Sequence, residues 1–344
     1  MDKKRCLTIV FLVCVFLAGY FLRSPVWRYS HKNQRVAAKP RGVIDYLGGD
    51  SRFINPLLDC EIADAKDILE FRPLAKNLQA VVDQEIGDRH AKKISIYFRA
   101  LKTGRWVGIN ENDTYTGASL AKVPLLVAYH KLAESDPKIL HRMMTYDGSF
   151  NEGTGQNITP SKRLEAGKTY TVSDLLYRMI VYSGNNSAVL LMRGLDESYL
   201  EDIFSDLGIP WDRSPEKQLL VSAKTFSSFF RVLYNATYLN RSMSENALHM
   251  LSQTEFKDGL VAGVPSDVLV AHKFGENKII DTQGNVMSAD LHDCGIVYHV
   301  EHPYLLCVMT QGSSQDALGT VIARISKTAY DFVNSPTYPI VKTP

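Results

Sequence analysis

The stretch Ala118-Ser-Leu-Ala-Lys-Val-Pro-Leu-Leu-Val127 decides the fold, because it joins a reactive pair of side chains to a helix that reads as buried. Ser119 and Lys122 stand three residues apart, about one helical turn, so the amine can face the hydroxyl. The apolar flank Val123-Pro-Leu-Leu-Val127 favours a helix inside the core. Since Ser/Lys pairs are also common on solvated helix faces, this pair alone does not establish a catalytic site.

Two further motifs come later in the chain. Ser183-Gly-Asn185 stands between two apolar segments, where a turn must form, although these residue types are also ordinary turn formers. His272-Lys-Phe-Gly275 ends an apolar run, where a lysine can equally guard a sheet edge against aggregation. Each motif alone is weak, but the three in this order are hard to obtain by chance.

The periodicity of apolar residues predicts an α+β fold, an α/β/α sandwich. We expect an antiparallel sheet of about five strands flanked by N- and C-terminal helices. An all-helical lobe at about 118–262 completes the fold, with the active site between lobe and sheet. Helical spacing covers Ile62–Ile86, Ala118–Leu132, Thr171–Met179, Asn186–Gly194, Val221–Leu233, Ser244–Leu251 and Ala317–Val333. Strand patterns cover Lys93–Arg99, Trp106–Ile109, Val268–Lys273, Gly295–His299 and Tyr304–Thr310.

Composition limits the classes of function. The 344 residues, 45% of them hydrophobic, suffice for one large domain or two small ones, and the net charge of +2 argues against nucleic-acid binding. The five cysteines show no zinc-ligand spacing, so we expect no metal and no cofactor. Cys294 and Cys307 fall on adjacent predicted strands, and their pairing stays open. We expect a monomer.

The N-terminus carries a membrane signal. Lys3, Lys4 and Arg5 precede an apolar run, Cys6–Leu22, and no small-x-small cleavage site comes after it. We therefore predict an uncleaved anchor at residues 1–23, with a cleaved signal peptide or a buried helix as alternatives. After the anchor we expect a basic, turn-rich tether at 24–59 and a single domain at 60–340.

The first motif provides a nucleophile and its base. A serine hydroxyl attacks poorly near neutral pH and needs activation. A desolvated lysine close to other cations has a lowered pKa, so Lys122 can accept the proton of Ser119. Placing Ser119 at a helix N-terminus also directs backbone N–H groups at a developing oxyanion.

The other motifs provide substrate contacts. Ser183 can relay a proton to a leaving nitrogen, and Asn185 can hold a substrate amide through a donor and an acceptor. Lys273 in a cleft could anchor a substrate carboxylate. Gly275 lets a ligand approach the strand, and the N–H of Glu276 could be a second oxyanion donor.

With these motifs the chain resembles the penicillin-recognising serine hydrolases, and most of all the class A β-lactamases. The resemblance covers about Ile62–Ser335 and includes the turn Gly263-Val-Pro265. It implies an acyl-enzyme formed with β-lactams or D-Ala-D-Ala-type cell-wall peptides. It also implies residue roles: Ser119 as acylated nucleophile, Lys122 as its base, Ser183 as proton shuttle, Asn185 as substrate-amide ligand and Lys273 as carboxylate anchor.

The departures from that family concern deacylation. Between the second and third motifs there is no Glu-x-x-x-Asn, whose glutamate activates the deacylating water in class A enzymes. The segment Leu207–Gln218 is short, and its acids, Asp212 and Glu216, lack the surrounding motif. The third motif has Phe274 in place of a hydroxyl residue, Gly184 replaces an aspartate in the second, and the segment Asn277–Leu291 looks inserted.

These departures predict acylation with slow deacylation. A penicillin- or cell-wall-peptide-binding or sensor module without turnover remains the alternative, and an esterase acting on small unrelated esters stays open. We expect the domain outside the cytoplasm, where the substrates of this chemistry lie. The basic residues after the apolar run oppose that orientation under the positive-inside rule.

Overall fold

The computed structural model describes residues 51–55, 69–153, 156, 158–280, 283 and 286–339. The predicted anchor at 1–23 and the apolar run Cys6–Leu22 lie outside these residues. Within the described part of the chain, each helix is too short or too polar to cross a bilayer. Residues 51–55 belong to the predicted tether, yet Phe53 and Ile54 are buried and the N–H of Asn55 donates to the carbonyl of Tyr234 at 2.7 Å. These contacts make residues 51–55 part of the folded domain.

The predicted antiparallel sheet of five strands is confirmed, in the order β2-β1-β9-β8-β7. Its strands are β1 (Lys93–Ala100), β2 (Trp106–Ile109), β7 (Val270–Ile280), β8 (Val286–Val297) and β9 (Tyr304–Gly312). The segment that looked inserted after the third motif extends the β7–β8 hairpin, which is paired through Ile280↔Val286. The bonded pair Cys294–Cys307 joins directly opposed residues of β8 and β9.

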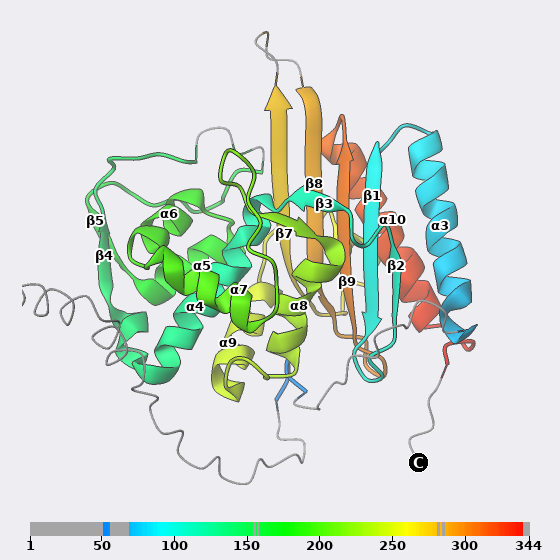
Figure 1. Ribbon diagram of the computed structural model, residues 1–344, viewed down its shortest axis with the longest axis horizontal. Coiled ribbons are helices and arrows are strands. Elements are labelled where there is room, and N and C mark those ends of the chain that lie inside the picture. Colours follow the sequence, from blue (N-terminus) through cyan, green and yellow to red (C-terminus); the bar gives the residue numbers. More distant parts are fainter. Residues whose placement is uncertain are drawn as a thin grey trace, which may run out of the picture. The chain divides into compact units, whose positions relative to one another are not determined.

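Helices α3 (Arg72–Gly87) and α10 (Gln315–Val333) pack together on one face of the sheet (Figure 1). The strands alternate accordingly: Ile94, Ile96 and Phe98 of β1 join the core beneath these two helices, whereas Tyr97 joins the core on the opposite face. Both faces of the sheet are therefore buried, as a sandwich requires.

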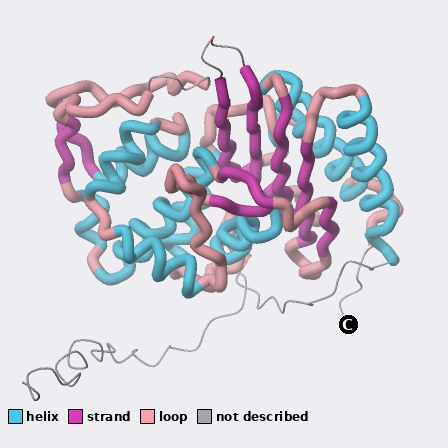
Figure 2. Tube along the Cα trace, turned by 45° about the horizontal axis from the view of Figure 1, so that its top comes forward, coloured by secondary structure: helices cyan, strands magenta, loops and turns pink. Residues whose placement is uncertain are grey.

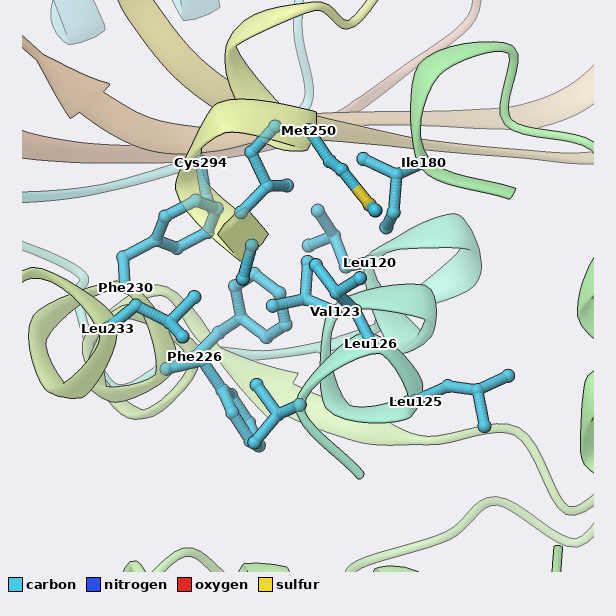
Figure 3. Packing of buried hydrophobic residues seen from close by; sticks show 14 of the residues in the cluster. Leu120, Val123, Leu125, Leu126, Ile180, Phe226, Phe230, Leu233, Met250 and Cys294 are labelled. Atoms are coloured by element: carbon cyan, nitrogen blue, oxygen red, sulfur yellow. The ribbon is translucent and has the colours of Figure 1, made fainter. Parts of the chain in front are cut away.

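The opposite face carries the helical lobe (Figure 2). Its helices are α4 (Lys122–Ser135), α5 (Val172–Val181), α6 (Asn185–Arg193), α7 (Glu197–Asp206), α8 (Ala223–Tyr234) and α9 (Arg241–Ser252). Helix α4 is apolar on nearly every side, as the sequence predicts for a helix inside the core. Figure 3 shows Leu120, Val123 and Leu126 packed among side chains of the neighbouring helices, including Ile180, Phe226, Phe230 and Met250.

The lobe contains strands that the predicted all-helical lobe omits. The hairpin of β4 (Met143–Tyr146) and β5 (Lys168–Thr171) lies within it. The ladder of β3 (Thr114–Thr116) and β6 (Leu220–Ser222) leads into it from the sheet. These strands have three or four residues each, so they are too short to produce a recognisable alternation.

Candidate active site

The nucleophile segment begins with a short 3₁₀ turn, η3 (Ala118–Ala121), which runs directly into α4. The sequence predicted one helix from Ala118. Pro124 has no N–H, so the bond that would extend the α-helical ladder back to the carbonyl of Leu120 cannot form. Ala118 has φ +45°, an uncommon value for a residue with a side chain, so the backbone is strained immediately before Ser119.

The amine of Lys122 is the centre of the site. Its Nζ donates to Oγ of Ser119 at 2.8 Å, which confirms that the amine faces the hydroxyl across one helical turn. The same Nζ donates to Oδ1 of Asn185 at 2.7 Å, to the carbonyl of Ser183 at 2.7 Å and to Oγ of Ser183 at 3.1 Å. One buried amine thus connects the first two motifs, which are far apart in sequence.

The third motif reaches the same point from the edge strand β7. Nζ of Lys273 donates to Oγ of Ser183 at 2.9 Å and to the carbonyl of Phe274 at 2.9 Å. The hydroxyl of Ser183 therefore lies between the two lysines. Ser183 itself has φ +54°, a second strained residue in the site.

Burial controls the charge of both lysines. The side chain of Lys122 is 6% exposed and that of Lys273 is fully buried. Burial first, and then the positive charge of Lys273, hold the pKa of Lys122 well below its ordinary value, while the carboxylate of Glu276 opposes this effect. Burial also lowers the pKa of Lys273 to about 7, against the opposing charges of Asp293 and Glu276. The pKa of Lys122 is thus shifted in the direction that a general base requires.

Gly275 is required by close packing. A Cβ at this position would lie 2.8 Å from the carbonyl oxygen of Gly117 and 3.1 Å from the backbone nitrogen of Leu120. The third motif therefore packs directly on the turn that carries Ser119. The next residue, Glu276, uses its carboxylate to accept from the N–H of Ile158 at 2.9 Å and from Nε2 of Gln315 at 3.0 Å.

Phe274 occupies the place where the resemblance expects a hydroxyl. Its side chain is 2% exposed and stacks on Phe256 with 4.4 Å between ring centroids. Asp293 lies opposite Phe274 on the neighbouring strand β8, and its Oδ1 is 2.8 Å from Nδ1 of His272. Both of these side chains are buried. Asp293 also accepts from the N–H of Leu260 at 2.9 Å, so the pair holds β7 against the segment before it.

Sequence reasoning missed the loop that lies over the second motif. Nε2 of Gln156 donates to the carbonyl of Ser183 at 3.1 Å, and Nδ2 of Asn185 donates to the carbonyl of Glu152 at 3.0 Å. Oε1 of Gln156 is buried without a hydrogen-bond partner among the described residues. The only signal for this loop is its run of glycines and polar residues, which gives no function.

The short segment between the second and third motifs is a tight turn. Between α7 and β6, the N–H of Ser214 donates to the carbonyl of Gln218 at 2.9 Å and that of Lys217 to Ser214 at 2.8 Å. Glu216 is exposed there and accepts from Oγ of Ser214 at 2.8 Å, which lowers the pKa of its carboxyl. Asp212 is also exposed.

Comparison with solved structures shows the same fold at low identity. The structure of PBP-A has a TM-score of 0.62 and 19% identity, over 75% of this chain and 96% of that chain. TLA-1 extended spectrum β-lactamase has a TM-score of 0.65 and 17% identity, over 76% of this chain and 99% of that chain. A β-lactamase from Chitinophaga pinensis DSM 2588 has a TM-score of 0.65 and 19% identity, over 75% of this chain and 100% of that chain. By sequence, no curated protein matches.

The family comparison agrees with the site. The model described as the beta-lactamase enzyme family matches residues 73–333, a range that contains all three motifs and the whole sheet. That match covers well over half of the 344 residues. The chain therefore belongs to the beta-lactamase enzyme family and has the fold of a β-lactamase-like serine hydrolase.

Proposed function

We propose that this protein is a serine hydrolase that forms an acyl-enzyme at Ser119 with β-lactams or D-Ala-D-Ala-type peptides and releases it slowly. The observation that carries the proposal is the position of Nζ of Lys122, 2.8 Å from Oγ of Ser119 in a buried site that lowers its pKa. A neutral amine at this distance can take the serine proton as the hydroxyl attacks.

Acylation then proceeds by a balanced proton transfer. Oγ of Ser119 bonds to the carbonyl carbon while its proton passes to Nζ of Lys122. The C–N bond of the substrate breaks, and the proton reaches the leaving nitrogen through the hydroxyl of Ser183, which lies 3.1 Å from Nζ of Lys122. This transfer restores the neutral lysine. The N–H groups of Ser119 and Glu276 are the proposed oxyanion donors.

Substrate contacts are proposed for the remaining residues of the motifs. Asn185 holds the amide of the acyl side, and Lys273 attracts the carboxylate of the leaving side. Since Phe274 brings no hydroxyl, the carboxylate depends on the lysine alone among the residues of the third motif. In support, a variant of PBP-A has been solved as an acyl-enzyme complex with penicillin G.

Slow release is proposed from the segment at residues 207–219. Deacylation needs a base that activates water, and the exposed Glu216 is bound to Ser214 with a lowered carboxyl pKa, which makes it a weaker base. Loss of a positioned base typically slows its step by about 10²–10⁴-fold. If no base activates the water at all, the protein stays acylated without useful turnover and acts as a receptor or sensor.

Mass spectrometry of the purified protein with penicillin tests the chemistry. We expect an adduct with the mass of one penicillin that forms rapidly and is released slowly. Ser119→Ala should give no adduct, and Ser242→Ala, an exposed serine on α9, should behave like the wild type. An adduct of equal yield on Ser119→Ala would refute the nucleophile. Rapid turnover without an observable adduct would refute slow release.

We also propose that the apolar run Cys6–Leu22 anchors the protein in a membrane with the domain outside the cytoplasm. This rests on the length of the run and on the location of such substrates. A reporter fused after Pro344 should be active only outside. Activity confined to the cytoplasm would reverse the orientation and agree with the charge of the residues after the run.

A further inference from the structure

His292 on β8 contacts the segment that leads into the nucleophile turn. It lies directly opposite Gly275 in the β7–β8 ladder, and Gly275 is the residue on which the turn Ala118–Ala121 packs. Nε2 of the ring is 3.1 Å from the carbonyl oxygen of Thr116, the last residue of β3, three positions before Ser119. Two neighbouring positions of the sheet therefore support the turn, one by having no side chain and the other by a hydrogen bond.

One protonation state of His292 satisfies both ring nitrogens. The carbonyl of Thr116 can only accept, so Nε2 must carry a proton and donate it. Nδ1 accepts from the backbone N–H of Thr310 on β9 at 3.3 Å, so Nδ1 must be unprotonated. The neutral ring with its proton on Nε2 meets both conditions, whereas a doubly protonated ring would set a second N–H against that of Thr310.

The surroundings of the ring favour this neutral form. His292 is fully buried, and burial is the main cause of its lowered pKa. The carboxylate of Asp290 on β8 opposes the shift, and the positive charge of Lys93 on β1 adds to it. The ring of Tyr115 meets the imidazole edge to face, with 5.2 Å between ring centroids. The pKa of His292 is thus shifted toward the form that the two hydrogen bonds require.

The backbone that His292 holds lies directly before a strained residue. The peptide group between Thr116 and Gly117 is fixed at both ends. Its N–H donates to the carbonyl of Leu219 at 2.7 Å, and its C=O accepts from the ring of His292. The next residue, Ala118, has φ +45°, and such strain persists only where the surrounding structure fixes the backbone. Loss of the ring's hydrogen bond would free one end of this peptide group and let the turn relax.

We propose that His292 is a positioning residue: by donating from Nε2 to the carbonyl of Thr116, it holds the turn that carries Ser119. This inference rests on the proposed acylation at Ser119. His292 acts through the backbone, so it controls the distance between the nucleophile and Nζ of Lys122, which is 2.8 Å. The substrate contacts proposed on α6 and β7 do not depend on the turn. The acylation rate at saturating substrate should therefore respond to His292, and the half-saturating concentration should not.

Two amide variants separate the two hydrogen bonds of the ring. His292→Gln places an amide nitrogen near the position of Nε2, so it can still donate to Thr116, but it leaves the N–H of Thr310 without an acceptor. His292→Asn does the reverse, because its Oδ1 can accept from Thr310 while its side chain is too short to reach Thr116. Each variant loses one buried hydrogen bond, so a merely structural role would slow acylation equally in both.

The assay is acylation by a fluorescent penicillin over a range of probe concentrations, well below the melting temperature of each variant. We expect His292→Asn to lower the limiting rate by roughly ten- to hundred-fold, since an error of about 1 Å in catalytic geometry costs about 10²-fold. His292→Gln should keep most of the wild-type rate. Equal slowing of both variants, or no slowing of His292→Asn, would overturn the inference. A wild-type protein that takes no label would refute the proposed function, and this inference with it.

The tautomer of His292 provides a second test that needs no variant and no substrate. In nitrogen NMR spectra of the wild-type protein with isotopically labelled histidine, the ring should carry its proton on Nε2 and none on Nδ1. Because this readout is independent of penicillin, it separates a wrong positioning contact from a wrong chemistry at Ser119. A proton on Nδ1 of His292 would overturn the inference even in a protein that is acylated.

Discussion

Gly275→Ala is the substitution whose effect the structure defines most directly. The added Cβ would stand 2.8 Å from the carbonyl oxygen of Gly117 and 3.1 Å from both the nitrogen and Cγ of Leu120. Carbon and carbonyl oxygen in contact normally lie about 3.3–3.6 Å apart, so β7 and the turn Ala118–Ala121 must separate by roughly half an ångström. Backbone atoms form most of this contact, so a side-chain rotation cannot relieve it.

The displacement acts on the reacting atoms. Ser119 lies inside the displaced turn, while Lys273 lies on the displaced strand and bonds to Ser183 at 2.9 Å. Since an error of about 1 Å in catalytic geometry costs about 10²-fold, we expect acylation to slow by roughly ten- to hundred-fold. Overpacking should also lower the free energy of unfolding by about 1–3 kcal/mol.

The assay is the second-order rate of labelling by a fluorescent penicillin, measured well below the melting temperature. Gly87→Ala is the matched control, because a Cβ at Gly87 meets no atom within 4 Å. It should label at the wild-type rate. Labelling of Gly275→Ala at that same rate, with the fold intact by circular dichroism, would refute the close packing of β7 on the nucleophile turn.

Three further outcomes concern the site, and a fourth concerns stability. In the proposed mechanism the neutral form of Lys122 is the base, so acylation should accelerate as pH rises through its lowered pKa, and a flat profile would contradict this role. For probes with a carboxylate, KM should rise above about pH 7 as Lys273 loses its proton, whereas probes without one should show no such rise. Glu216→Gln should leave the adduct lifetime unchanged, because this exposed residue bonds to its own turn; a longer lifetime by mass spectrometry would make it a base. Asp293→Ala should cost about 3 kcal/mol in urea unfolding, since it leaves the buried Nδ1 of His272 and the N–H of Leu260 without their partner, and a change below about 0.5 kcal/mol would contradict that.

Most of the fold was predictable because the apolar residues of its main helices and strands repeat regularly over long segments. The β1 strand alternates over eight residues, and α4 keeps an apolar character that only a core helix tolerates. Helix α7 carried a usable signal that was overlooked. Asp196 caps it by accepting from the N–H of Ser198 at 3.1 Å, and Leu200, Ile203 and Phe204 have helical spacing.

The site was predictable where motifs carried it and not elsewhere. Ser119, Lys122 and Ser183 meet because each stands at the start of a helix or in the turn between two helices, and such positions can be recognised in the sequence. The contact of Gln156 with the carbonyl of Ser183 spans 27 positions and comes from a loop without periodicity. Contacts of this kind depend on how the loop packs, which no local pattern encodes.

The position of the acids, rather than their number, determines the expected fate of the acyl-enzyme. Glu276 is near enough to influence the charge of both lysines, yet its two carboxylate oxygens accept from Ile158 and from Gln315. A carboxylate committed in this way is a poor base for water. Lys122 is 6% exposed, and this burial is the main cause of its lowered pKa. We therefore expect an ester formed at Ser119 to be long-lived, because the carboxylate of Glu276 is already held by Ile158 and Gln315.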